Sequence, residues 1–488
     1  MEEVVFYCSQ GSPDDKQGAL SLAVATTLHS QQQTVAFRQA ASYPNGAVIT
    51  GTKPGDRVLV AAKGKALINV YSWGKESPDQ RIPVPEQLAC LALCPNGTES
   101  YSDIVEDETN ETRLPKFRLP YLLIGGGVSG KLYVWELNSG LLLNVKEAHY
   151  QMPTSMKVTS DGSYLITSGK DSRVLVWRIA DLVAFNKDDE KLVKPVHVFS
   201  DHTLEVTDVF VSNNTHQDSK LYTVSKDSTI RVYALQNFTL LSTFVINGQI
   251  QSITVDSADR AMYVGLAHGH IRIINLYEAN PATNVLEARG GHGKVLTLQP
   301  DHELKETITY HAGHGVTQLA LSLDGSLVIS GDEKGRVAVI DVVSKQVVKE
   351  LKELSGSVTS VQVLNTFNDV SVAGQQAEKN TRVIPTFKRV ITTNEPKEQD
   401  VLYQIADEQE EKLFDIDAHL DKVATEAMFF ENFTNVNSEV VMRDNSHADG
   451  AKLKEAQDKL DKVTKAYSDL RAMYEQLYSE HAALLEKQ

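Results

Sequence analysis

The sequence predicts an all-β ring of seven four-stranded blades, a β-propeller, followed by an α-helical tail with a coiled coil. Two observations lead to this prediction. Pairs of short apolar strands around a Gly- or Asp-containing turn recur seven times within the first 365 residues. Apolar residues then repeat with an unbroken 3,4 spacing from Leu453 to Leu484. The 488 residues are 41% hydrophobic and 23% charged, which is ordinary for a globular protein.

The seven copies are spaced as propeller blades. One equivalent position in the second strand of each copy gives intervals of 48, 64, 42, 56, 41 and 66 residues. The shortest intervals match the period of roughly 40–45 residues in a four-stranded blade, and the longer ones indicate inserted loops. We expect such loops at Asp103–Thr112, Asn186–Lys194 and Glu278–Leu304. The equivalent positions are Ala23, Tyr71, Trp135, Trp177, Tyr233, Ile274 and Ile340.

The end of the repeat region predicts how the ring closes. Val358–Leu364 is typical of an inner strand, and it would complete the blade that Val4–Ala40 begins. Closing a ring of sheets in this way removes an exposed sheet edge. We therefore expect residues 1–20 to be required for the stability of the whole ring.

The strongest copies carry a recognisable motif. One reads Tyr164-Leu-Ile-Thr-Ser-Gly-Lys-Asp followed by Arg173-Val-Leu-Val-Trp-Arg. This pattern resembles the WD-repeat family, over about residues 1–365. The resemblance implies a hydrogen-bonded structural set in one blade, made of His149, Ser168, Asp171 and Trp177. The sequence departs from the motif where Glu136 and Arg178 replace its final Asp and where several blades carry Tyr or Ile in place of Trp.

Residues 445–488 are predicted to form one coiled-coil helix, by self-pairing or with a partner helix. A helix of about 38 residues would extend roughly 57 Å. The alternative is a helix that packs back on its own domain. The predicted seam consists of Leu453, Ala456, Leu460, Val463, Tyr467, Leu470, Tyr474, Leu477, His481 and Leu484.

Residues 366–444 are predicted to be an acidic linker with one short amphipathic helix. The apolar spacing from Leu413 to Phe430 indicates that helix. It either docks on a partner's groove or packs beneath the propeller, and the sequence leaves both open. The chain thus divides into residues 1–365, 366–444 and 445–488.

The net charge of −16 is concentrated in the tail. Residues 391–488 hold 22 acidic and 11 basic side chains, and the excess is greatest between Glu395 and Glu431. This balance argues against a general grip on the nucleic-acid backbone, and we expect no sequence-specific nucleic-acid binding. No apolar run approaches the roughly 18 residues of a membrane helix, so no membrane association is expected.

The three cysteines are too few for a disulfide framework and indicate a reducing compartment. Cys90 and Cys94 lie four residues apart in an alternating apolar run, and Cys8 lies in the apolar opening strand. We expect all three to fill the core.

Each candidate catalytic or metal-binding motif in the sequence lacks a required residue or spacing. The segment Ala288–Val295 resembles a phosphate loop but has Ala and Val where Gly and Ser or Thr are required. The histidines between His268 and His314 lack the spacing of a metal site. Gly125–Gly127 is predicted to be a blade turn. We therefore expect no enzyme activity, no catalytic residue, no metal and no cofactor.

Longer stretches resemble a narrower family, the fungal WD-repeat subunit of the Rix complex. They include Lys65-Ala-Leu-Ile-Asn-Val-Tyr, Ser129-Gly-Lys-Leu-Tyr-Val-Trp-Glu-Leu-Asn-Ser-Gly, Asp201-His-Thr-Leu and, in the tail, Ala466-Tyr-Ser-Asp-Leu-Arg-Ala-Met-Tyr. The resemblance implies a non-enzymatic scaffold for maturation of the large ribosomal subunit, needed for processing of pre-rRNA internal transcribed spacer two. It also implies a nuclear location, in nucleolus and nucleoplasm.

The partners that this resemblance implies are two helical-repeat subunits, a midasin-type ATPase and the pre-ribosomal large subunit. Members of that family are also implicated in DNA replication licensing. The alternative is a WD-repeat adaptor of another assembly, such as a ubiquitin-ligase or trafficking complex. The sequence does not distinguish which face of the ring binds which partner.

Overall fold

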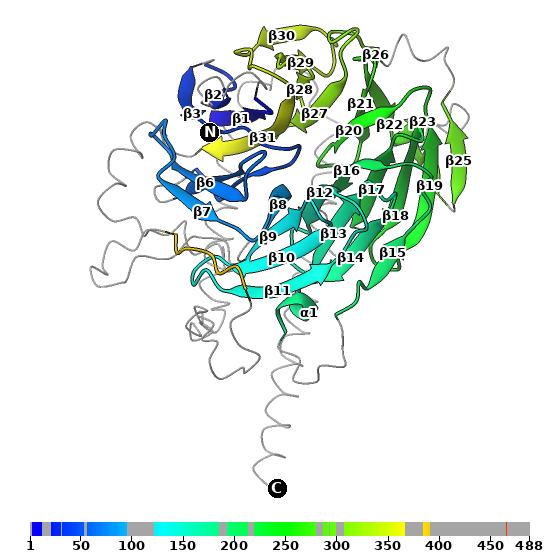
Figure 1. The fold of residues 1–488 in the computed structure, drawn as a ribbon. Coiled ribbons are helices and arrows are strands. Elements are labelled where there is room, and N and C mark those ends of the chain that lie inside the picture. Colours follow the sequence, from blue (N-terminus) through cyan, green and yellow to red (C-terminus); the bar gives the residue numbers. More distant parts are fainter. Residues whose placement is uncertain are drawn as a thin grey trace, which may run out of the picture. The chain divides into compact units, whose positions relative to one another are not determined.

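Seven β-sheets of four or five strands, together with one two-stranded sheet, make up the strands of the described part of the chain in a computed structural model (Figure 1). The structure describes residues 2–11, 21–30, 32–52, 56–94, 122–184, 193–212, 219–279, 286–291, 293–298, 307–366, 384–390 and 465. Nearly all of these belong to the first of two units into which the chain divides, Met1–Gln404 and Ile405–Gln488. The prediction of a seven-bladed propeller is confirmed.

The blades are numbered here by their inner strands, in the order in which they follow one another around the ring. Blade 1 contains β31 (Val358–Thr366), β1 (Glu2–Ser9), β2 (Leu22–Thr27) and β3 (Gln33–Arg38). Blade 2 contains β4 (Ala47–Ile49), β5 (Arg57–Ala61), β6 (Leu67–Ser72) and β7 (Gln80–Pro83). Blade 3 contains β8 (Leu88–Cys94), β9 (Leu122–Gly127), β10 (Lys131–Glu136) and β11 (Leu142–Glu147). Blade 4 contains β12 (Pro153–Val158), β13 (Tyr164–Gly169), β14 (Val174–Arg178) and β15 (His197–Phe199).

The remaining blades follow the same plan. Blade 5 contains β16 (Val206–Val211), β17 (Lys220–Ser225), β18 (Thr229–Ala234) and β19 (Thr239–Val245). Blade 6 contains β20 (Ile250–Val255), β21 (Ala261–Leu266), β22 (Ile271–Asn275) and β26 (Thr307–Ile308). Blade 7 contains β27 (Val316–Leu321), β28 (Leu327–Asp332), β29 (Val337–Asp341) and β30 (Val347–Glu350). A short helix, α1 (Ile179–Val183), follows β14, and in the described part of the chain no helix is long and apolar enough to cross a membrane.

The ring closes as the sequence predicts. β31 pairs antiparallel with β1 from Glu2↔Thr366 to Ser9↔Val358, so the last strand of the ring is the inner strand of the first blade. β1 is thereby enclosed between β31 and β2. Its side chains from Val4 to Cys8 are at most 1% exposed.

The core lies between neighbouring blades. The seven equivalent positions predicted from the repeat spacing all fall on the third strand of a blade, and each is at most 2% exposed. Cys8, Cys90 and Cys94 are buried in this core, as expected, and none of the three forms a disulfide. Their burial raises the pKa of Cys90 to about 12 and that of Cys94 to about 11, so they are poor nucleophiles.

Hydroxyl groups join the inner strands of successive blades. From blade 4 onward, a side chain on each inner strand donates a hydrogen bond to a carbonyl at the start of the next inner strand. The bonds are Thr154 Oγ1 to Val206 O (2.6 Å), Thr207 Oγ1 to Ile250 O (3.0 Å), Ser252 Oγ to Val316 O (3.0 Å) and Thr317 Oγ1 to Val358 O (2.7 Å). Neighbouring inner strands are therefore joined by side-chain hydrogen bonds as well as by packing.

Gly125–Gly127 is a strand and not the predicted turn. These residues end β9, where Gly125 and Gly126 pair with both β8 and β10 and Gly127 pairs with β8. A Cβ on Gly125 would lie 3.0 Å from the ring of Trp135, and one on Gly126 would lie 2.8 Å from Cys90 Sγ. The glycines therefore provide room for side chains of the neighbouring strands, a role that local sequence does not reveal.

The predicted insertion at Glu278–Leu304 contains strands of its own. β23 (Tyr277–Ala279) pairs with β24 (Leu286–Ala288). β25 (Lys294–Thr297) then pairs in parallel with β19, adding a fifth strand to blade 5. The insertion of blade 6 thus covers the outer edge of its neighbour, which limits exposed sheet edge.

Candidate functional site

Three of the four residues assigned to a polar set in blade 4 do meet. His149 precedes β12, Asp171 lies in the turn between β13 and β14, and Trp177 is on β14. His149 Nδ1 lies 3.0 Å from Asp171 Oδ1, and its Nε2 lies 3.0 Å from the hydroxyl of Thr167. Trp177 Nε1 donates to the same hydroxyl at 3.3 Å. The set connects the loop between two blades to the turn and third strand of blade 4.

The fourth member is Thr167, and the expectation of Ser168 is corrected. Ser168 Oγ instead lies 3.0 Å from Thr154 Oγ1 and donates to Ser155 O at 3.2 Å, both on β12. Successive side chains of a strand point to opposite faces, so only one of two adjacent hydroxyls can reach the histidine.

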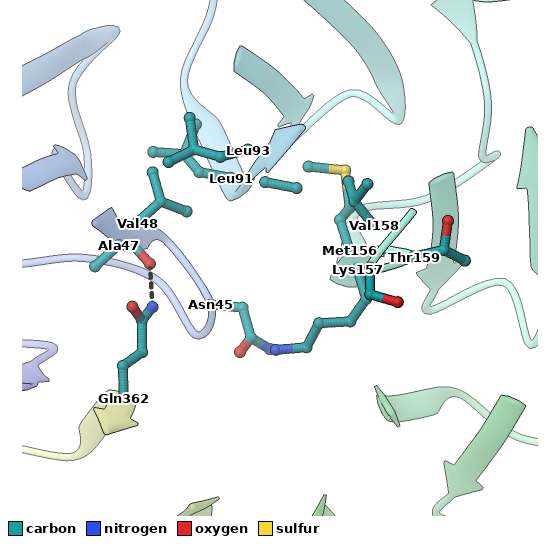
Figure 2. A pocket seen from close by; sticks show the side chains of 12 residues that line it. Asn45, Ala47, Val48, Leu91, Leu93, Met156, Lys157, Val158, Thr159 and Gln362 are labelled. Atoms are coloured by element: carbon teal, nitrogen blue, oxygen red, sulfur yellow. Dashed lines mark hydrogen bonds between the residues drawn. The ribbon is translucent and has the colours of Figure 1, made fainter. Parts of the chain in front are cut away.

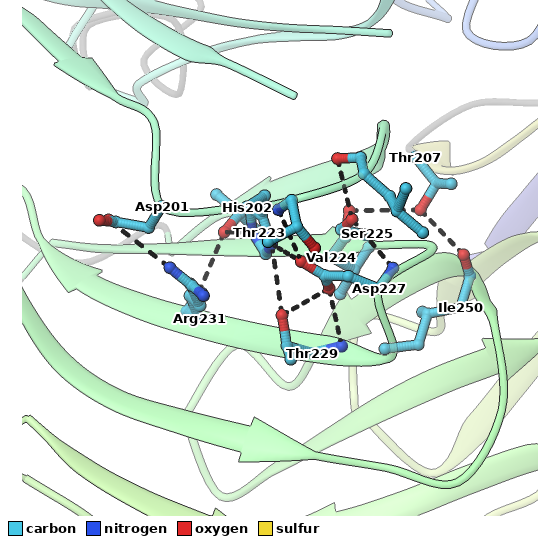
Figure 3. A network of polar contacts seen from close by, with 12 residues as sticks. Asp201, His202, Thr207, Thr223, Val224, Ser225, Asp227, Thr229, Arg231 and Ile250 are labelled. Carbon is cyan, nitrogen blue, oxygen red and sulfur yellow. Dashed lines mark hydrogen bonds and ion pairs between the residues drawn. The ribbon is translucent and has the colours of Figure 1, made fainter. Parts of the chain in front are cut away.

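Blades 5 and 7 contain two further sets of the same kind, which sequence reasoning missed. In blade 5, His202 lies 3.0 Å from Asp227 Oδ2 through Nδ1 and 2.8 Å from Thr223 Oγ1 through Nε2 (Figure 3). In blade 7 the corresponding contacts join His311 to Asp332 Oδ2 (3.1 Å) and to Ser330 Oγ (2.8 Å).

These two sets lack the tryptophan that marks blade 4. Tyr233 holds that position in blade 5 and donates to Asp201 at 2.8 Å, and Ile340 holds it in blade 7. The sequence did contain a signal for these sets. In all three blades the His precedes the Asp by a similar number of residues, namely 22, 25 and 21.

The three sets are arranged to stabilise the blades. His149, His202 and His311 are at most 6% exposed, and both ring nitrogens of each have a partner. Neither nitrogen is left to bind a metal or to move a substrate proton. Among the described residues, no group of three or more His, Cys, Asp or Glu side chains is arranged to hold a metal ion.

The carboxyl groups of these sets are strongly stabilised as anions. Burial alone would raise their pKa, but hydrogen bonds from the paired histidine and from nearby amides or hydroxyls outweigh it. The pKa of Asp332 falls to about 2, and those of Asp171 and Asp227 are also lowered.

We therefore expect the ring to lose stability in acid. A carboxyl with a folded-state pKa below its ordinary value of 3.8 contributes stability above that value, and the contribution is lost as pH falls towards 2. The free energy of unfolding in urea should be nearly equal at pH 7 and 5 and should fall at pH 4 and 3. The difference between wild type and Asp332→Asn should shrink from pH 5 to pH 3, and a difference that stays constant over that interval would contradict the assignment.

A pocket of about 210 Å³ opens beside the inner strands of blades 2, 3 and 4 (Figure 2). Its wall is largely aliphatic, and Gln362 reaches it from β31, where its Nε2 donates to Ala47 O at 2.8 Å. Lys157 is the single titratable side chain among its described lining residues. The described lining therefore lacks a second titratable group that could pair with Lys157 as acid and base.

The predicted seam lies outside the described residues. This applies to Leu453, Leu460, Val463, Tyr467, Leu470, Tyr474, Leu477 and Leu484, and equally to the short helix expected between Leu413 and Phe430. Self-pairing of the tail stays a prediction.

Comparison with known proteins identifies the repeats. A family model described as WD domain, G-beta repeat, matches residues 140–178, 193–234 and 302–341. Each match begins on or before the outer strand of one blade and ends on the third strand of the next. The three stretches hold the three His–Asp pairs, so the model matches where the buried His–Asp pair is present.

Full-length relatives decide the family. The chain is 42% identical to the pre-rRNA-processing protein IPI3 of Candida albicans, over 100% of both chains. It is 42% identical to the IPI3 protein of Meyerozyma guilliermondii, over 99% of this chain and 100% of the relative. The chain belongs to the IPI3 family. The IPI3 protein of Saccharomyces cerevisiae is 35% identical, over 95% of this chain and 97% of its own length. The family resemblance inferred from the sequence is confirmed.

Proposed function

We propose that this protein is a non-enzymatic scaffold of ribosome biogenesis that acts in pre-rRNA processing. The observation that carries the proposal is its full-length identity to IPI3 proteins, whose name states that activity. The described ring supports a scaffold. Its polar sets are buried and fully used within the blades, which leaves the loops at both ends of the ring for protein contacts.

The finer proposal is a place within a nuclear complex. Its partners would be two helical-repeat subunits and a midasin-type ATPase, on the pre-ribosomal large subunit, in nucleolus and nucleoplasm. The tail would self-associate, and a second role would lie in DNA replication licensing. The charge distribution favours protein contacts, because the acidic residues 391–488 would be repelled by RNA.

We expect the tagged full-length chain to co-purify with large-subunit precursors from the cells that express it. RNA containing internal transcribed spacer two should be enriched several-fold over an untagged control, and depletion of the protein should cause that precursor to accumulate. An adaptor of a ubiquitin-ligase or trafficking complex would recover neither. Absence of the precursor from the purified material, together with normal processing after depletion, would refute the proposed function.

We expect the double variant Leu470→Asp, Leu477→Asp to be a monomer of 53.8 kDa by light scattering and the wild type to have twice that mass. Two carboxylates in an apolar seam stay unpaired when helices associate. Ser468→Asp, Gln476→Asp adds the same charge between seam positions and should keep the wild-type mass. Equal masses for wild type and the Leu variant would exclude self-pairing through this seam.

A further inference from the structure

A segment far along the chain lies against the outside of blades 2 and 3. Residues 384–390 (Ile-Pro-Thr-Phe-Lys-Arg-Val) follow the ring in sequence and are drawn in orange beside β7 and β11 in Figure 1. Gln80 holds one end, donating from Nε2 to Ile384 O (3.0 Å) and accepting from Ile384 N (3.2 Å). The other end is held by Lys388 N, which donates to Gly140 O at 2.8 Å.

Two side chains of the segment are buried in the ring. Ile384 is 1% exposed and Phe387 is 4% exposed, and both belong to the apolar cluster that joins blades 2 and 3. The ring of Phe387 stacks on Trp135 with centroids 5.6 Å apart, and Trp135 stacks in turn on Tyr133. Burial of two such side chains removes apolar surface from water and stabilises the contact between segment and ring.

The ring contains a donor that the segment satisfies. In blade 4 the indole of Trp177 donates to Thr167. The matching position in blade 3 is Gly125, because the strand registers place Gly125 opposite Tyr133 just as Thr167 lies opposite Leu175. Trp135, fully buried, donates instead to Lys388 O at 3.0 Å. A buried indole N–H without an acceptor would destabilise the ring, so the carbonyl of Lys388 supplies an acceptor that blade 3 lacks at the matching position.

The approach of the two backbones also requires a particular residue. Gly140 has a φ of +71°, and a Cβ there would lie 2.7 Å from Thr386 O. A side chain at this position would be strained and would press against the segment. The indole, the glycine and the Gln80 amide together form a site shaped for this backbone.

We propose that this groove is a peptide-docking site of the ring whose ligand is the chain's own segment Ile384–Lys388, called the strap below. Docking of the strap determines where the residues after 390 leave the ring. Without it they would be tethered only to β31, the innermost strand of blade 1. The 17 residues from 367 to 383 can span roughly 60 Å, enough to reach the outer strands from there. The proposal is independent of the function proposed above.

Distances between spin labels on the full-length chain test the proposal. Because all three native cysteines are buried, labels attach selectively to introduced ones. One label is attached to Val390→Cys, just after the strap, where the native side chain is 73% exposed. The other is attached to Val343→Cys on blade 7, where the native side chain is 86% exposed. Dilution with unlabelled protein removes distances between copies. We expect one narrow distance distribution, which broadens several-fold in Ile384→Ala, Phe387→Ala.

Matched variants separate undocking of the strap from damage to the ring. Thr386→Ala changes an exposed side chain of the strap and should keep the narrow distribution. A second pair, Tyr150→Cys with Val343→Cys, has both labels on the ring and should stay narrow in every variant. If the alanine pair broadens this second distribution, Lys388→Pro decides instead, because it removes the donor to Gly140 O and leaves the buried side chains of the strap in place. A broad wild-type distribution, or one as narrow in the deciding variant as in wild type, would overturn the proposal.

Discussion

Deletion of residues 1–20 is expected to abolish cooperative unfolding of the ring. β1 lies between β31 and β2, so its loss exposes both neighbours and opens the ring at blade 1. The side chains removed include Phe6 and Tyr7, both 0% exposed. The loss is comparable to the whole stability of a domain, roughly 5–15 kcal/mol. Circular dichroism during heating should show no sharp transition for the truncated chain.

Two point variants provide reference values for the effect of this deletion on the free energy of unfolding. Phe6→Ala should lower the free energy of unfolding by about 3–5 kcal/mol, because it leaves a cavity between blades 1 and 2. Val343→Ala, at a site 86% exposed, should change it by less than about 0.5 kcal/mol. A truncated chain that melts like wild type would show that the ring does not need β1.

Asp332→Ala should be the most destabilising single change among the polar sets. Asp332 is 0% exposed and accepts hydrogen bonds from His311 Nδ1 at 3.1 Å and from Arg336 Nε at 2.8 Å. It also accepts from the backbone amides of Lys334 and Arg336. Removing the carboxylate leaves these donors unpaired, at a cost of about 3 kcal/mol in urea unfolding.

A surface ion pair serves as the control. Asp181 lies 3.9 Å from Arg178, and both side chains are about half exposed. Asp181→Ala should change the free energy of unfolding by less than about 0.5 kcal/mol. Equal effects of the two variants would mean that the buried set contributes no more than an exposed pair.

The ring was predictable because its strands repeat. Each blade must bury a strand pair against its neighbours, so the apolar pattern recurs and the third-strand positions, such as Trp135 and Tyr233, can be aligned without a structure. Closure by Val358–Leu364 followed from counting strands. Alternating apolar runs likewise placed Cys90 and Cys94 in the core.

Features that depend on contacts distant in sequence were not predictable. The choice between Thr167 and Ser168 depends on which strand face meets His149. The glycines of β9 were predicted to form a turn. Their actual role is to leave room for the ring of Trp135, which lies on another strand and cannot be inferred from the local sequence. The strap has no motif, since the residues of blades 2 and 3 that hold it, such as Gln80 and Trp135, precede it by 304 and 253 positions in the sequence.

The pairing of β1 with β31 also sets an order of events during synthesis. Its residue pairs are separated by about 350 positions, so β1 leaves the ribosome long before its inner partner exists. At about 5–20 residues per second, the delay is roughly 20–70 seconds. Throughout that time an apolar strand has an unpaired edge, which is the kind of surface that chaperones bind and that aggregates form from. The stability of the finished ring is thus obtained by leaving the nascent chain dependent on protection until its last strand emerges.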